Sequence, residues 1–343
     1  MFCQRYFTKV NSSFCKLVQV LRTEYTVDFR SVQTSVSVWN GNTTDPERIN
    51  LFFDNEVQDL LKKLTRKDLN FVFRSRKMGQ KLEPPEYKFM TTEQLEKKYK
   101  EIEKDADIIL QMPPVVPLRK EIDVTLSNDP ALMGYQSDKL VFTDISFGKT
   151  ERNRMIVVRD EKGNLRKATW EERNRLNQIY FPRPGREVRV PSMFKEEFLK
   201  PILDRGDYEF ILDRACIQFE PDDPMYQRIT RTTYDHIDIN QAYNVLRSTR
   251  HFGPLVYYLV NENKIDDLLL ENLQSDRLED ACWLVSLYYI INPLAKRKQC
   301  VTGDECSFVK EFIEDYSKKK SVLKLALKAY SDVKRSQELQ ASQ

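Results

Sequence analysis

The chain has 343 residues, of which 31% are charged and 41% are hydrophobic. Its 55 lysines and arginines nearly balance 52 aspartates and glutamates, and the resulting charge of +3 is too small to indicate a general nucleic-acid coat protein. With only 9 glycines and 2 histidines, a glycine-cradled phosphate enzyme or a histidine-based metal site is hard to build. The length allows two or three compact domains.

The N-terminal segment is basic and apolar. Residues 1–23 contain four basic and no acidic side chains, which leaves the rest of the chain at a charge of −1. Because Lys9 and Lys16 interrupt any apolar core, the pattern is typical of a mitochondrial transit peptide and not of a secretory signal. The alternative is an ordinary basic first helix. We predict a transit peptide over residues 1–33 and a linker over residues 34–50.

Membrane and disulfide classes are not indicated. The longest apolar stretches, residues 253–260 and 283–291, are under half of the ~20 residues that span a bilayer. The six cysteines are scattered, with neither a C-x-x-C pair nor dense spacing, so neither a zinc framework nor a secreted disulfide scaffold is indicated. We expect a reducing compartment and no membrane partner.

Two helices and a proline-rich connection are predicted for residues 51–130. Asp54 can cap a short helix with an apolar face. Thr91 and Gln94 form a capping-box pattern, and apolar residues then repeat at spacings of four and three through Ile109. This helix must end before Pro113, because proline lacks the backbone donor and disfavours helix in the residue before it.

The middle of the chain is predicted to be a small α+β unit over residues 131–190. Residues 139–147, 154–160 and 165–168 are rich in β-branched and aromatic side chains, with a turn sequence at 161–164, so we expect an antiparallel sheet of two or three strands. Thr169 and Glu172 form a second capping box that opens a helix through Tyr180.

From residue 191 onward helical periodicity dominates. An irregular helical-hairpin array with a long C-terminal helix is predicted for residues 191–343, and no 34-residue repeat is found. The predicted helices are 192–204, 206–219, 223–234, 238–249, 252–261, 264–273, 275–291 and 305–335. The fold class is therefore α+β and predominantly α-helical. Apolar stripes on residues 95–109 and 308–330 are candidates for protein docking, although core packing is the stronger interpretation.

Isolated motifs that could carry chemistry have simpler explanations. Residues 147–150 (FGKT) lack the second glycine of a phosphate loop and are interpreted as a turn after a strand. Cys216 could act with His236, but no oxyanion hole accompanies them, and a buried thiol is the ordinary use. Residues 300–306 hold two cysteines without a histidine nearby. Asp223 before Pro224 is typical of a helix N-terminus and needs no cation.

Charge is sorted into blocks along the chain. Residues 149–189 contain twelve basic side chains, mostly arginine, against six acidic ones. Arginine binds phosphate with two parallel hydrogen bonds and stacks on bases, so this region is a candidate RNA contact. The alternative is that these arginines pair with the protein's own acids. Residues 204–223 and 262–280 are acidic, and residues 318–335 are again strongly basic, a pattern that suits a protein placed between partners of different charge.

Several runs of sequence resemble one known family, that of mitochondrial small-subunit (28S) ribosomal protein twenty-two. The resemblance covers about residues 52–293, and the ends of the chain match weakly. The runs that carry it are residues 139–147, IVVRDEKGNLRKATWEERNRLNQIYFPRPGR at 156–186, QFEPD at 218–222, TYDHID at 233–238, LRSTRHFG at 246–253, KID at 264–266, YKFMT at 87–91 and QMPPV at 111–115.

The resemblance implies a structural, non-enzymatic constituent of the animal mitochondrial ribosome in the matrix. Its partners would be the small-subunit rRNA and neighbouring ribosomal proteins, with no cofactor, metal, membrane or small-molecule substrate. A free helical-repeat RNA-binding or ribosome-assembly factor is the alternative, and a matrix enzyme is a third. The predicted rRNA contacts are Arg152, Arg154, Arg159, Arg166, Lys167, Arg173, Arg183 and Arg186, with Arg247 and Arg250 as further candidates.

Overall fold

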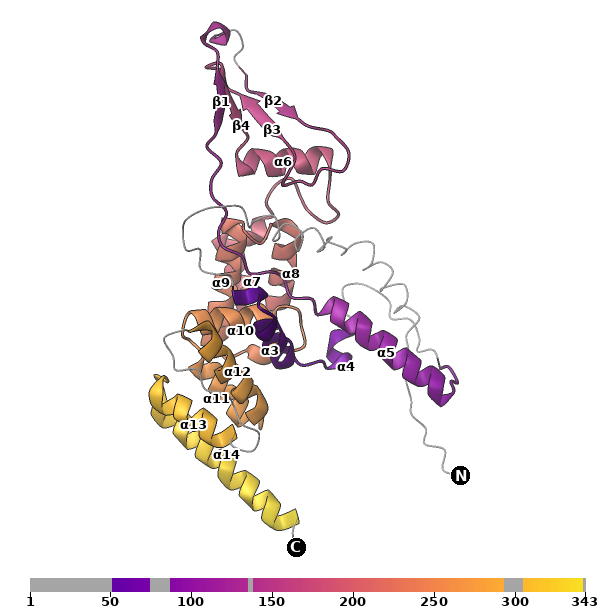
Figure 1. Cartoon of the computed structure of the whole chain (residues 1–343), viewed down its shortest axis with the longest axis vertical. Coiled ribbons are helices and arrows are strands. Elements are labelled where there is room, and N and C mark those ends of the chain that lie inside the picture. Colours follow the sequence, from indigo (N-terminus) through magenta and orange to yellow (C-terminus); the bar gives the residue numbers. More distant parts are fainter. Residues whose placement is uncertain (1–50, 75–86, 135–137, 293–304, 342–343) are drawn as a thin grey trace. The chain divides into compact units, whose positions relative to one another are not determined.

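A computed structural model describes residues 51–74, 87–134, 138–292 and 305–341 (Figure 1). The predicted transit peptide (1–33) and linker (34–50) lie outside these residues. The chain divides into two compact units. We call residues 117–205 and 213–229 the α+β unit, and the remainder the helical unit. This division differs from the predicted boundaries, because the α+β unit begins earlier than residue 131 and extends beyond residue 190.

The α+β unit is built on a four-stranded antiparallel sheet with the strand order β1-β4-β3-β2. The predicted sheet is confirmed, and the strand missing from the prediction is β1, whose sequence TLSN lacks an apolar alternation. The elements of this unit are β1 (Thr125–Asn128), β2 (Leu140–Thr143), β3 (Ile156–Arg159), β4 (Asn164–Lys167), α6 (Trp170–Tyr180) and α7 (Glu196–Asp204), with short 3-10 turns at Pro130–Leu132 and Ser192–Phe194.

Helix α6 lies beside the sheet and covers one of its faces (Figure 1). Leu176 of α6 packs against Ile156 and Val158 of β3, and both of these are fully buried. The predicted capping box starts α6, since the Thr169 side chain accepts from the Glu172 amide and Glu172 accepts from the Thr169 amide. The helix is thus fixed locally by its cap and held on the sheet by a small apolar core.

The helical unit contains the remaining described helices. Two helices, α8 (Tyr208–Gln218) and α9 (Pro224–Ile239), contribute residues to both units. The others are α3 (Asn55–Thr65), α4 (Leu69–Val72), α5 (Thr92–Ile109), α10 (Phe252–Asn261), α11 (Asp266–Gln274), α12 (Leu278–Ile291), α13 (Glu305–Asp315) and α14 (Lys320–Ala341), with 3-10 turns at Leu51–Phe53 and Tyr243–Val245.

The core of the helical unit forms where α3, α10 and α12 pack together. Val57, Leu61 and Leu64 recur on one face of α3 and are fully buried, as the helical period predicts. The long apolar segment of α10 is buried on nearly every side, with Leu255 and Leu259 at 0% exposure. An element that is apolar all round belongs at the centre of its unit, and α10 occupies that position.

The prediction of a helix over 238–249 is wrong. Residues 238–239 are the end of α9, and beyond them Tyr243–Val245 forms a short 3-10 turn. Gln241 and Ser248 take left-handed φ values of 52° and 55°, which an α-helix does not tolerate. The turned backbone brings Arg247 into the interior, where it contacts Glu271.

The single helix predicted over 305–335 is also wrong, because the structure has two helices, α13 and α14. At the break, the Asp266 carboxylate on α11 accepts hydrogen bonds from the backbone amides of Lys318 and Lys319, and the Ser317 hydroxyl also accepts from the Lys319 amide. A distant side chain therefore caps the new helix, which a local pattern cannot reveal. The predicted apolar stripe on 308–330 packs in the core, with Phe312 and Leu323 buried.

Candidate nucleic-acid interface

Two of the predicted RNA-contact arginines, Arg154 and Arg173, are buried in the α+β unit. Arg154 donates to the carbonyl oxygens of Asp144 at 2.6 Å and Lys149 at 2.9 Å, and its guanidinium lies 3.6 Å from the Phe181 ring centroid. Arg173 donates through one nitrogen to the carbonyls of Glu151, Arg152 and Arg154 at 2.9–3.0 Å. Both side chains therefore satisfy backbone acceptors inside the protein.

A second group of arginines, Arg152, Arg183 and Arg186, pairs with three carboxylates. Glu220 accepts from Arg183 and Arg186 at 2.8 Å each, and Glu151 pairs with both of these arginines at 2.5 and 3.5 Å. Arg152 pairs with Asp222 at 3.1 Å. Burial raises the pKa of Glu220, but the arginines lower it by more, so the net pKa lies below its ordinary value.

Arg166 forms a two-pronged ion pair with Glu172. Its guanidinium donates to the two oxygens of Glu172 at 2.8 and 2.9 Å and also to Asp160 at 3.1 Å. The hydrogen bonds from Arg166 lower the pKa of Glu172 to about 2. Because Glu172 also belongs to the capping box of α6, this pair joins β4 to the start of the helix.

The two candidates in the helical unit are also engaged with protein groups. Arg247 is buried and donates to Glu271 at 2.5 Å, to Asn272 at 2.6 Å and to Asp280 at 3.3 Å. Arg250 is half-buried and its Nε lies 3.4 Å from His251. Eight of the ten predicted arginines and lysines thus contact the protein's own atoms, which was the alternative to RNA contact.

The remaining two candidates, Arg159 and Lys167, lie on the sheet face away from α6. Cross-strand partners of an antiparallel sheet share a face, and Ile156 and Val158 mark the α6 side. The register therefore assigns two rows to the opposite side. We call this set the outer sheet face: Leu140, Arg159 and Leu165 in one row, and Phe142, Val157 and Lys167 in the other.

The outer sheet face combines apolar surface with positive charge. Phe142 is 50% exposed and Leu140 is 38% exposed, while the other four side chains are half-buried. Its two cations face no acid within the set, and no described residue forms an ion pair with either of them. Phe142 lies on the edge strand β2 of the same face as the two cations. An aromatic ring there can stack a base while the cations bind phosphate.

Phe142 is a residue that sequence reasoning missed as a candidate contact. The signal was present in the sequence. Leu140 and Phe142 are two residues apart in one strand, and Val157 and Arg159 are two apart in the next. Side chains two residues apart lie on the same face of a strand, so pairing of the strands can place all four on a common face. The sequence did not reveal which face α6 would cover, and so the exposed side could not be assigned.

Other sequence motifs adopt structural roles. Gly148 has a left-handed φ of 78° in the turn after β2, and Lys149 beside it pairs with Asp144, which confirms a turn in place of a phosphate loop. The Asp223 carboxylate accepts from the Met225 amide at 2.9 Å, which confirms its predicted cap of α9.

The proposed thiol and imidazole each have their own neighbours. The Cys216 sulfur lies 3.5 Å from the Tyr226 hydroxyl, and the His236 ring lies 3.1 Å from the Tyr208 hydroxyl. Within the described ranges, no group of three or more His, Cys, Asp or Glu side chains is placed to hold a metal ion. No helix in the described part of the chain is long and apolar enough to cross a bilayer.

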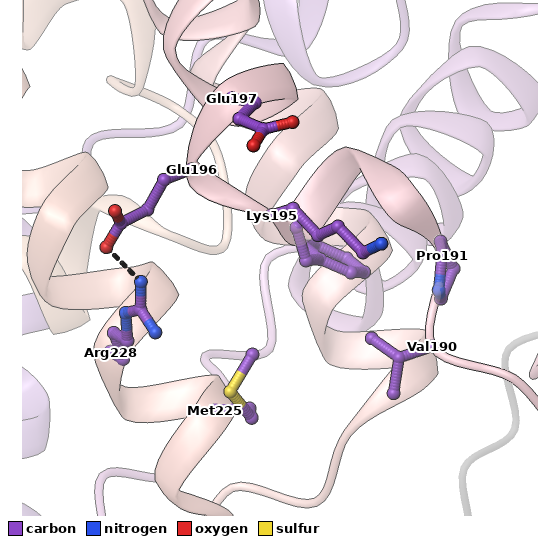
Figure 2. A pocket seen from close by; sticks show the side chains of 8 residues that line it. Val190, Pro191, Lys195, Glu196, Glu197, Met225 and Arg228 are labelled. Carbon is purple, nitrogen blue, oxygen red and sulfur yellow. Dashed lines mark hydrogen bonds and ion pairs between the residues drawn. The ribbon is translucent and has the colours of Figure 1, made fainter.

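A pocket of about 520 Å³ lies in the α+β unit beside the start of α7 (Figure 2). Val190, Pro191 and Met225 give it an apolar lining, and Glu196 forms an ion pair with Arg228 at its edge, as Figure 2 shows. The charged groups around this pocket neutralise each other, and the chemistry it offers is mainly apolar contact.

Comparison with known proteins shows extended similarity. The model of the family "Mitochondrial 28S ribosomal protein S22" matches residues 50–293. The mouse protein named "Small ribosomal subunit protein mS22" is 41% identical over 285 residues, which is 82% of this chain and 79% of the mouse protein. The bovine protein of the same name is 40% identical over 284 residues, with the same two shares. The match contains both the outer sheet face and the buried arginine network, and the chain belongs to the mitochondrial 28S ribosomal protein S22 family.

Proposed function

We propose that the chain is a structural constituent of the mitochondrial small ribosomal subunit and supports mitochondrial translation in the matrix. The observation that carries this proposal is the family match over residues 50–293, with relatives at about two-fifths identity that are named as small-subunit proteins. Its partners would be the small-subunit rRNA and neighbouring ribosomal proteins. Residues 1–33 would direct import.

For the rRNA contact we assign the outer sheet face. Arg159 and Lys167 can bind phosphates, and Phe142 on the edge strand of the same face can stack a base of an unpaired segment. The buried arginines support this surface from within: Arg166 fixes β4 to α6, and Arg173 holds the loop before β3. The protein would thereby present a few cations on a rigid scaffold instead of a broad basic coat.

Sedimentation of a mitochondrial lysate tests the assignment to the subunit. A tagged copy of the full chain should travel with the small subunit in a sucrose gradient, in a constant ratio to other small-subunit proteins. A free RNA-binding or assembly factor would stay near the top of the gradient or appear only on immature particles, and either result would reject the proposal. A matrix enzyme would also remain light.

A further inference from the structure

The C-terminal helix α14 carries two apolar faces. One is buried: Leu323 and Leu327 are 0% and 7% exposed where α14 packs on α11 and α13, and Figure 1 shows α13 and α14 side by side. The second face is exposed, with Val322, Leu325 and Val333 at 47%, 70% and 57%. The sequence pattern on 308–330 predicts only the first of these faces.

The exposed residues form a continuous stripe. Residues 322, 325, 329 and 333 follow one another at spacings of three and four, so they lie on one side of the helix. The stripe is about 16 Å long at 1.5 Å per residue. Polar side chains normally cover the outer face of a surface helix, and an apolar row in their place indicates a contact surface.

Positive charge borders the stripe on one side. Lys328 and Arg335 lie beside it on the helix surface with Asp332 between them, and all three are exposed, so this border has a net charge of +1. No side chain that the structure describes forms an ion pair with either cation. The bordering cations complement an acidic partner, and the aliphatic stripe offers contact area without any polar group.

We propose that this stripe, residues 322–333 of α14, docks an amphipathic helix of a neighbouring ribosomal protein whose apolar row is flanked by acidic residues. The row of aliphatic side chains forms a ridge on α14, and such a ridge packs into the groove between two rows of side chains on a partner helix. RNA fits it less well, because Val322 and Leu325 can neither stack a base as an aromatic ring does nor donate to phosphate. The inference rests on the proposed place in the small subunit.

Photo-cross-linking in assembled subunits tests the stripe. A tagged full chain with p-benzoylphenylalanine in place of Leu325 is expressed in mitochondria, the small subunit is isolated on a gradient, and the adduct is identified by mass spectrometry. We expect a peptide of another small-subunit protein with apolar residues at helical spacing and acidic residues beside them. The matched control carries the same probe at Lys320, which is exposed on another side of α14; its yield should be at least fivefold lower.

Charge reversal supplies the second readout. K328E/R335E should lower the yield of the Leu325 adduct at least fivefold, and reversal of the acidic residues in the identified peptide should restore it. An adduct with rRNA, with a second copy of this chain or with another segment of the same chain would overturn the inference. So would a yield equal to the Lys320 control, or one that charge reversal leaves unchanged.

The two proposals fail in different ways. If the probe-bearing chain is absent from the small-subunit fraction, the proposed function fails. If the chain is present there and Leu325 gives none of the expected adducts, only the docking inference fails. V322S/L325S/V333S should fold like the wild type, because exposed substitutions change stability by about 0.5 kcal/mol or less each, and circular dichroism checks this.

Discussion

Two arginines of the α+β unit, Arg154 and Arg173, act as interior hydrogen-bond donors. Arg173 shows the principle, since a single nitrogen donates to three backbone carbonyls of the irregular segment before β3. Five donors in a planar fork make arginine suited to this use. A local excess of arginine in a sequence can therefore indicate irregular backbone that needs donors as well as a surface for RNA.

The Glu172 carboxylate should make the stability of the protein depend on pH. Its pKa is lowered to about 2 by Arg166, below the ordinary 4.5, so its stabilising effect is complete above pH 4.5 and is lost as pH falls towards 2. E172Q keeps the capping box but removes the charge. We expect it to reduce the free energy of unfolding at pH 7 by about 1–2 kcal/mol, the value for a pair partly screened by solvent.

Urea unfolding of the full chain at pH 7, 4 and 2.5 measures this effect. The difference between E172Q and wild type should shrink from pH 7 to pH 2.5. The matched control is E171Q, which removes an exposed carboxylate one residue earlier and should change stability little at any pH. A difference that stays constant across these pH values would contradict the assigned role of the Arg166–Glu172 pair.

Local caps were predictable at the level of single residues, whereas long-range partners were not. The boxes at Thr91 and Thr169 and the cap at Asp223 involve atoms within three residues of each other, and all three are confirmed. Asp54 stands at the predicted start of α3, but its side chain makes no capping hydrogen bond. The partners of Arg183 and Arg186 include Glu220, more than thirty residues away. Only the folded chain brings that carboxylate between them, so the sequence left internal pairing and RNA contact equally open.

At the scale of elements, strong periodicity predicted helices well and their ends less well. Helices α3, α5, α6, α10 and α12 occur where the apolar period placed them. The errors fall where tertiary contacts replace local rules. Asp266 accepts from the amides of Lys318 and Lys319 at the start of α14, and positive φ values redirect the chain around Arg247. Strand β1 was missed because its pairing with β4 compensates for a polar sequence.

The hairpin between β3 and β4 depends on a glycine. Gly163 has a φ of 81°, and a Cβ atom there would lie 2.3 Å from the carbonyl oxygen of Asp129, which belongs to the segment after β1. G163A should therefore add backbone strain and a clash that only a shift of the sheet edge can relieve. We expect a loss of about 2–4 kcal/mol in the free energy of unfolding, measured by urea titration.

Gly148 provides the matched control for this substitution. Its φ is 78°, almost the same, but a Cβ atom there meets nothing within 4 Å. G148A should therefore show the strain alone, about 1 kcal/mol. Equal losses for G163A and G148A would contradict the predicted clash between a Cβ atom at residue 163 and the segment after β1.

At the scale of the whole molecule, the small net charge is the sum of acidic and basic blocks that have different roles. The acidic blocks supply partners for the protein's own cations: Glu220 lies within one and Glu271 within another. Among the surfaces that the structure describes, the outer sheet face and the stripe of α14 with its bordering Lys328 and Arg335 are the ones we assign to partners. The family match accounts for the assembly in which such surfaces are used, and the two compact units present them.

The central claim is that rRNA contact resides on the outer sheet face. It is tested most directly by ultraviolet cross-linking of assembled small subunits, with mass spectrometry of the RNA–peptide adducts from residues 138–170. Charge reversal in R159E/K167E should lower these adducts by about tenfold, because each phosphate contact contributes to binding. The control R175E/K162E makes the same change in charge at exposed positions off this face and should leave them largely intact. Undiminished adducts in R159E/K167E, or an equal loss in the control, would contradict the claim.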